Sequence, residues 1–218
     1  MLSEHSGVTS LKTNSSNAEN LLALTLCNLI EVEPDMKTIN AKTLLEGYLG
    51  GRRDFRNLNL VSIQLFGCHL QGINLSGSHL KHAYLAYTLL DSAILVNSNL
   101  EGADLTSARL CSAQLRGANL RYAQLLHSQC VAADFSHASL HKASLVISNL
   151  RKANLVGANL SGAILDSAYL HSADLSEANL SNTNLTRAKG ARLDRAILAR
   201  TTTLPSGLPY FDNPEDNP

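Results

Sequence analysis

The chain has 218 residues, of which 44% are hydrophobic and 17% charged, and its 18 basic side chains balance its 18 acidic ones. This length fits one globular-sized unit with terminal extensions. The zero net charge argues against a chain whose overall acidity or basicity selects its partners. The apolar stretch Leu21–Ile30 is too short to span a bilayer, and residues 1–20 lack the features of a signal peptide. No membrane association is expected.

The N-terminal region divides into two parts. Residues 1–19 are rich in Ser, Thr and Asn, and we expect a disordered tail. Residues 20–51 are expected to form a cap that is partly helical. A short helix is predicted over about 40–49, ended by two glycines. Its inward side is expected to carry four apolar or aromatic residues: Leu44, Leu45, Tyr48 and Leu49.

A large apolar residue then falls on every fifth position from Phe55 to Leu185. These 27 centre positions hold 24 Leu, two Phe (Phe55 and Phe135) and Cys130. Two residues before the centre, the side chain is usually small: 16 are Ala and seven are Ser, Thr or Cys. We call this second site the minus-two position. Its early members are larger, with Leu58, Ile63 and Ile73 in place of alanine.

A period of five fits neither regular element, because such residues scatter around a helix and alternate between the faces of a strand. The centre and minus-two residues share a face, so the chain must turn a corner within the three steps from each centre to the next minus-two residue. A chain that turns every five residues in one sense winds into a coil. Stacked coils place equivalent residues in columns about 4.8 Å apart.

Charged residues support this arrangement independently. Between Phe55 and Leu185 the chain has eight basic and seven acidic side chains, and none occupies a centre or minus-two position. Buried unpaired charge costs several kcal/mol, so both columns are predicted to face inward. One outward column alternates in charge and predicts ion pairing from coil to coil: Lys81, Glu101, Arg121 and His141. The glycines Gly77, Gly102, Gly117, Gly157 and Gly162 recur at corner positions, as tight turns favour.

Runs such as Ala103-Asp104-Leu105 and Ala153-Asn154-Leu155 resemble the A(D/N)LXX signature of pentapeptide-repeat proteins. The resemblance implies an all-β solenoid, the right-handed quadrilateral β-helix, with four pentapeptides per coil. Twenty-seven repeats make about 6.75 coils, and we assign the solenoid to 52–200. The lead-in Gly51-Arg52-Arg53-Asp54-Phe55 is similar to that of many cyanobacterial members and suggests a cyanobacterial origin.

The repeat is interrupted at Lys189-Gly190. The pattern resumes, shifted by three, at Ala191-x-Leu193 and Ala196-x-Leu198, which predicts a shifted terminal coil. Residues 201–218 are expected to form an irregular tail that caps this coil, with homodimerisation through the C-terminal end as the alternative. Five basic residues crowd into 186–200, but a solvated terminal coil explains them better than a nucleic-acid site.

No catalytic, cofactor-binding or metal-binding constellation is recognisable, and we predict that the protein is not an enzyme. The seven histidines of the repeats spread over all four sides of the coil. Cys68 and Cys130 are expected to be buried and too far apart to bridge, with Cys111 pointing outward. This pattern predicts a reducing, cytoplasmic compartment.

One side of the predicted coil stands out. The side centred on Leu65 and its equivalents presents seven outward apolar or aromatic residues: Phe66, Tyr84, Tyr87, Leu126, Val146, Ile147 and Ile164. Such patches often mark protein contacts, although sheets also favour these residues for cross-strand packing. The favoured function is a protein-binding scaffold for an unidentified partner. The alternative, a DNA mimic that binds a type II topoisomerase, lacks the acidic surface it needs.

Overall fold

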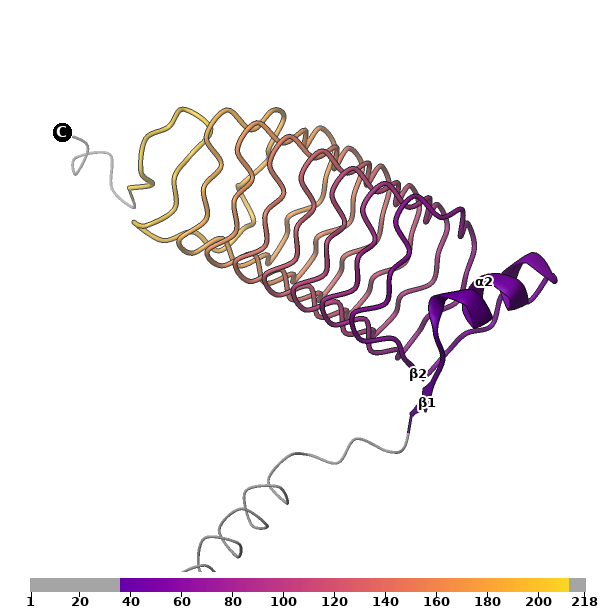
Figure 1. Cartoon of the computed structure of the whole chain (residues 1–218). Helices are drawn as coiled ribbons and strands as arrows, with labels where there is room; N and C mark the ends of the chain where they lie inside the picture. The colour runs from indigo at the N-terminus through magenta and orange to yellow at the C-terminus, as the bar shows by residue number, and fades with distance from the viewer. Residues whose placement is uncertain (1–35, 212–218) are drawn as a thin grey trace, which may run out of the picture. The chain divides into compact units, whose positions relative to one another are not determined.

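The computed structural model describes residues 36–211. The chain divides into two compact units, Met1–Met36 and Lys37–Pro218, and the description below concerns the second (Figure 1). Its helix and strands are β1 (Lys37–Thr38), α2 (Ala41–Leu49) and β2 (Leu58–Asn59). The predictions for 1–19 and for the apolar stretch before Pro34 lie outside the described residues.

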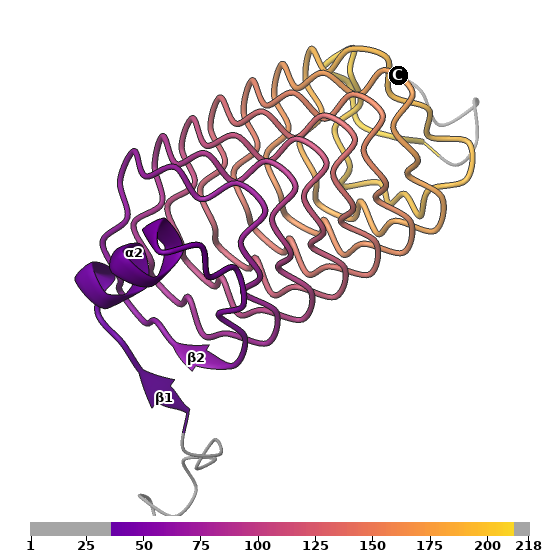
Figure 2. The same ribbon diagram turned by 90° about the vertical axis from the view of Figure 1, so that its right-hand side faces the viewer.

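Stacked coils form almost all of this unit, as two perpendicular views show (Figures 1 and 2). Parallel β-bridges join residues twenty apart, beginning with Asp54 and Asn74 and ending with Tyr169 and Lys189. A bridge occurs at every fifth residue, so each coil has four sides. The predicted quadrilateral solenoid is therefore present. Each bridge is a short ladder: Leu155 N donates to Asp174 O at 2.8 Å, and Asp174 N donates to Ala153 O at 3.0 Å.

The interior contains the two columns that the sequence predicts. From Leu60 to Leu185 every centre residue is at most 2% exposed, including Cys130 and Phe135. The minus-two alanines are buried beside them in the same core cluster. Buried Ser and Thr at minus-two positions, apart from Ser128, donate to main-chain carbonyls, as Thr88 Oγ1 does to Leu65 O at 2.8 Å. The prediction was wrong for Cys68, which is only half-buried, because it begins its column and no earlier coil covers it.

The corners explain a further regularity of the sequence. The second residue after each centre adopts a left-handed conformation, with φ between 54° and 60° for twenty non-glycine residues. Gly77, Gly102, Gly117, Gly157 and Gly162 have φ between 63° and 68°, which confirms their assignment to corners. Asn, Ser, His and Gly recur there because short polar side chains and glycine tolerate this region best.

At many centre positions the residue directly before the leucine is Asp or Asn, and this residue has a structural purpose. Its side-chain oxygen accepts a hydrogen bond from the backbone N–H two residues later and closes the next corner. Asp104 Oδ1 accepts from Thr106 N at 2.9 Å, and Asn154 Oδ1 accepts from Val156 N at 3.1 Å. The acidic residues at this position therefore serve the turn and do not by themselves indicate a binding site.

The expected helix is α2, whose N-cap Asn40 accepts a hydrogen bond from Thr43 N at 2.9 Å and which ends at Gly50. Leu44 is fully buried in the core cluster, and Leu45 and Tyr48 pack against it. Leu49, predicted to face inward, is 83% exposed, because one further residue rotates the helix by about 100°. The sequence did not predict β1, which pairs in parallel with β2.

The C-terminal coil is shorter than the others. Asn179 bridges Ile197 after eighteen residues and Asn184 bridges Thr203 after nineteen, compared with twenty elsewhere. Leu193 and Leu198 pack against the core, as the shifted pattern predicts. An antiparallel bridge between Thr203 and Pro209 then turns the chain back on itself.

Candidate functional surface

The seven predicted residues all lie outside the core on one side of the coil, which we call the apolar side. Five of them are exposed: Phe66 (55%), Tyr84 (37%), Tyr87 (56%), Ile147 (39%) and Ile164 (44%). Leu126 and Val146 are half-buried. Their outward placement follows from the repeat, since each stands one residue before, or one or two after, an inward leucine.

Three of these residues form an aromatic cluster: Phe66, Tyr84 and Tyr87. The Phe66 and Tyr84 rings are stacked, with centroids 5.5 Å apart and planes inclined by 14°. The Tyr87 ring meets Phe66 edge-on at 5.4 Å. The outward residue between Tyr84 and Tyr87 is Ala86, whose short side chain is only 3% exposed. The rings thus hold one another in place while large parts of them face solvent.

A polar coil divides the apolar side in two. Asp104 stands in the bridge column directly between Tyr84 and Gln124. In the column of Phe66, the equivalent residue two coils later is the polar Thr106. The aromatic cluster is therefore separate from an aliphatic group of Leu126, Val146, Ile147 and Ile164. The prediction of one patch of seven residues therefore has to be refined. The four-per-coil register already places Asp104 in this column, so the division was readable from the sequence.

A neighbouring apolar feature was missed. Val61 is 49% exposed at the corner next to the apolar side. It borders a cavity of about 350 Å³ whose lining includes Ile39, Leu60 and Ile63. Ile39 follows β1, whose pairing with β2 has no repeat signature. For that reason the sequence pattern could not predict this cavity.

The adjacent side is polar, as the column of Asn59, His79, Asn99, Asn119, Ser139, Asn159 and Asn179 predicts. Asn119 Nδ2 donates to Asn99 Oδ1 at 3.1 Å across two coils. In the alternating charged column, Lys81 Nζ lies 3.0 Å from Glu101 Oε1, and this contact lowers the pKa of Glu101. Among the described residues of this column, the predicted ion pairing is limited to Lys81 and Glu101. His141 Nδ1 instead lies 2.7 Å from Ser161 Oγ.

The described residues offer little for catalysis. Among residues 36–211, no three or more His, Cys, Asp or Glu side chains gather where they could hold a metal ion. Burial raises the pKa of the Cys130 thiol to about 12 and raises those of Cys68 and Cys111 above their ordinary value. Thiols that stay protonated are poor nucleophiles. The same part of the chain contains no helix long and apolar enough to cross a membrane.

Comparison with known proteins agrees with the geometry. A family model described as pentapeptide repeats matches in eight copies, with segments that run from residue 59 to residue 200. The chain belongs to the pentapeptide-repeat family. Its members fold as right-handed quadrilateral β-helices, the class observed here. No curated protein matches the chain.

Several solved structures of this family are similar in fold. QnrB1, described as a plasmid-mediated fluoroquinolone resistance protein, has 19% identity and a TM-score of 0.47, with 69% of this chain and 81% of that chain covered. Rfr23 from the cyanobacterium Cyanothece 51142 has 24% identity and a TM-score of 0.44, with coverage of 75% and 97%. HetL from the cyanobacterium Nostoc sp. strain PCC 7120, involved in heterocyst differentiation regulation, has 29% identity, a TM-score of 0.30 and coverage of 79% and 100%.

Proposed function

We propose that this protein is a non-enzymatic binding module that docks a partner protein through the apolar side of its solenoid. The aromatic cluster makes the primary contact, and the aliphatic group extends the surface. The observation that carries this proposal is the contiguous exposure of three aromatic rings on a rigid support.

Exposed aromatic side chains suit such a role energetically. Tyr and Phe bury large areas on binding and are enriched at interfaces, and Tyr keeps a polar group for the rim. The cluster is bordered by polar side chains, among them Gln64 and Asp104, which stand in the Tyr84 column. A hydrophobic centre with a polar rim is the usual anatomy of a protein interface.

Preorganisation adds to this argument. Phe66 and Tyr84 already contact each other, and the main chain beneath them is joined to the next coil, as in the bond from Leu65 N to Tyr84 O at 2.9 Å. Binding therefore orders few side chains, and less free energy is lost to immobilisation. A partner with a complementary apolar surface would meet a preformed platform.

The experiment compares two aromatic surfaces of the same solenoid. Tyr87 and Tyr122 both occupy corners with φ of 60°, and they are 56% and 43% exposed. We would purify partners with the wild type, with the Tyr84→Asp/Tyr87→Asp variant and with the Tyr122→Asp control. The proposal predicts a stoichiometric protein partner that binds the wild type and the control but not the double variant. Equal recovery by all three forms would refute the assignment of this side.

A further inference from the structure

The short terminal coil leaves part of the preceding coil uncovered. Lys189 bridges Tyr169, and Ile197 bridges Asn179. The terminal coil therefore takes eight residues, from Lys189 to Ile197, where the preceding coil takes ten, from Tyr169 to Asn179. A chain two residues shorter cannot follow the same contour and pair along it. Leu193 still reaches the core, but no bridge joins 190–194 to the coil before it.

Three main-chain groups lose their partners as a result. In the preceding coil, Leu155 N donates to Asp174 O, Ala153 O accepts from Asp174 N, and Lys152 N donates to His171 O. The equivalents one coil later are Leu175 N–H, Ala173 C=O and Ser172 N–H. None of these three groups has a hydrogen-bond partner among residues 36–211. Ala173 and Leu175 are buried residues, whereas Ser172 is exposed. Buried main-chain groups are almost always paired in folded proteins, and an unpaired sheet edge is a template for another chain.

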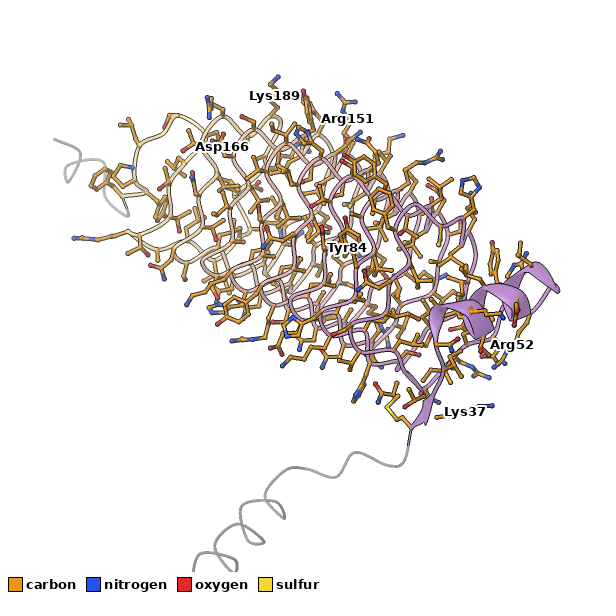
Figure 3. The ribbon with its side chains drawn as sticks, in the orientation of Figure 1. Lys37, Arg52, Tyr84, Arg151, Asp166 and Lys189 are labelled. Carbon is orange, nitrogen blue, oxygen red and sulfur yellow. The ribbon has the colours of Figure 1, made fainter. Side chains whose placement is uncertain are left out.

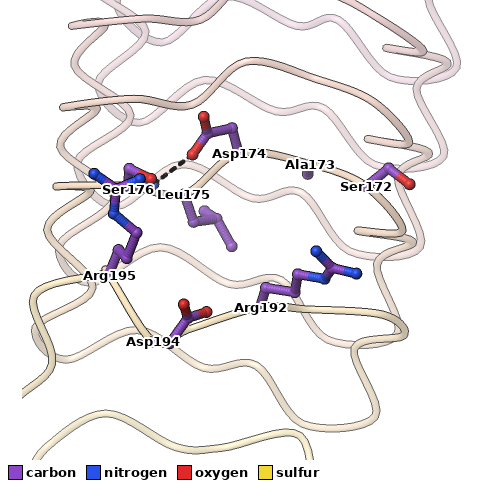
Figure 4. Close-up of a pocket in the computed structure, with 8 residues that line it drawn as sticks. All are labelled: Ser172, Ala173, Asp174, Leu175, Ser176, Arg192, Asp194 and Arg195. Carbon is purple, nitrogen blue, oxygen red and sulfur yellow. Dashed lines mark hydrogen bonds between the residues drawn. The ribbon is translucent and has the colours of Figure 1, made fainter.

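The unpaired groups line a real opening, which we call the edge opening. It has a volume of about 340 Å³, with Ser172 to Ser176 along one wall and Arg192, Asp194 and Arg195 on the other. Figure 4 shows the two arginines at opposite ends of this opening. Neither arginine forms an ion pair with another residue of the described part of the chain.

Basic residues also dominate the surface next to it. The Arg151 guanidinium lies 5.1 Å and Lys189 Nζ 4.9 Å from the centre of the Tyr169 ring. Both project together from the solenoid surface (Figure 3). With Arg192 and Arg195 they make four cations beside the edge opening. The acidic groups there are Asp194, Asp174 and Glu177, whose backbone N donates to Arg195 O at 2.8 Å. The Asp174 carboxylate accepts a hydrogen bond from Ser176 N at 2.9 Å, and this bond, together with the charge of Arg195, lowers the pKa of Asp174.

We propose that the edge opening binds an extended acidic peptide of a partner protein as an added strand. Main-chain carbonyls of the peptide accept from Leu175 N–H and Ser172 N–H, and a peptide N–H between them donates to Ala173 C=O. Glutamate or aspartate side chains of the peptide reach Arg192 and Arg195. A small anion would leave the Ala173 carbonyl unpaired, and a basic peptide would be repelled by the four cations. This site does not depend on the apolar side.

The test uses a fluorescently labelled peptide that alternates glutamate and valine, titrated against the full chain by fluorescence anisotropy. The wild type is expected to bind it saturably. Arg192→Glu/Arg195→Glu should weaken binding at least about tenfold, whereas Arg116→Glu, which changes an exposed arginine in the same outward column four coils before Arg195, should not. Normal unfolding transitions would show that each variant is folded.

Two controls separate strand addition from simple charge attraction. A peptide whose amides are all N-methylated keeps its charge but cannot donate to Ala173 C=O in any register, and it should bind at least tenfold more weakly. Insertion of Ala-Asn after Gly190 restores the twenty-residue spacing between Asn179 and Ile197 without changing net charge, and it should abolish binding. Unchanged binding in both controls, or no saturable binding by the wild type, would overturn the proposal. Binding that appears only after removal of 212–218 would also overturn it, and would assign the opening to the chain's own acidic end.

Discussion

The Phe66 ring stacks on the Tyr84 ring from the next coil, with the two centroids 5.5 Å apart, and the two residues stay 55% and 37% exposed. This contact joins neighbouring coils on the outer surface, where the repeat itself supplies no pairing requirement. An exposed ring pair contributes about 0.5–1.5 kcal/mol beyond burial of area. Its contribution to folding is therefore small in comparison with that of the leucine columns.

Phe66→Ala should accordingly cost little stability. We expect a loss of about 0.5–1.5 kcal/mol in the free energy of unfolding, since the ring loses Tyr84 and Tyr87 but leaves no cavity. Denaturant titration measures this value. A loss above about 3 kcal/mol would show that the aromatic cluster mainly stabilises the fold.

Phe135→Ala should be far more destabilising. Phe135 is fully buried in a centre column, so its removal costs about 3–5 kcal/mol through lost transfer free energy and a residual cavity. Phe135→Leu restores the residue that most other coils carry and should cost less than about 1.5 kcal/mol. The same titration checks both values. Similar losses for Ala and Leu would contradict a close-packed column.

Alanine substitutions at two corner glycines of the same backbone conformation distinguish the cost of backbone strain from the cost of side-chain crowding. Gly67 and Gly102 have φ of 64° and 63°, but a Cβ at 67 would meet nothing within 4 Å, whereas one at 102 would lie 2.6 Å from His82 Nδ1. Gly67→Ala should cost about 1–2 kcal/mol from the left-handed conformation alone. Gly102→Ala should cost more, and addition of His82→Ala should remove the excess. Equal losses in thermal unfolding would show that the histidine ring moves aside freely.

The Lys81–Glu101 pair predicts a weak pH dependence. The lysine lowers the pKa of Glu101 below its ordinary value of 4.5, so the pair stabilises the fold above that value. This stabilisation is lost as pH falls through the folded-state pKa, which lies lower still. Lys81→Met should raise the pKa of Glu101 in NMR titrations and cost less than about 1 kcal/mol at neutral pH. An unchanged Glu101 pKa in the variant would disprove the contact.

Cysteine alkylation should reveal the difference between the closed core and less buried positions of the solenoid. In a Cys27→Ser background, iodoacetamide should modify half-buried Cys68 and Cys111 under native conditions, whereas Cys130 should react only when the chain unfolds. Burial raises the pKa of Cys130 to about 12, so almost no thiolate is present at neutral pH. Peptide mass spectrometry identifies the modified residue. Native modification of Cys130 at the rate of Cys111 would contradict a closed core.

The repeat made the interior predictable, since each centre leucine and each minus-two alanine must face inward if the chain turns every five residues. Leu120 and Ala118 are both fully buried, as this argument requires. The corner glycines were predictable for the same reason. Local periodicity determines these features, and no long-range contact is needed to recognise them.

Features that depend on the exact path of the chain were not predictable. The shift at Lys189-Gly190 was visible in the sequence, but it did not reveal that Leu175 N–H and Ala173 C=O would lose their partners. The pairing of Lys37–Thr38 with Leu58–Asn59 likewise follows no pattern, because two-residue strands carry no periodicity. The candidate surface lies between these cases: its residues were identified, but its division by Asp104 was overlooked.

Site-specific photo-crosslinking tests the central claim most directly. A photoreactive phenylalanine analogue would replace Phe66 in one variant and Tyr122 in another, in cells of the source organism. The account predicts a discrete protein adduct from position 66 that is absent from position 122. An adduct of the same protein from position 122 alone, or from both positions equally, would contradict docking through the aromatic cluster.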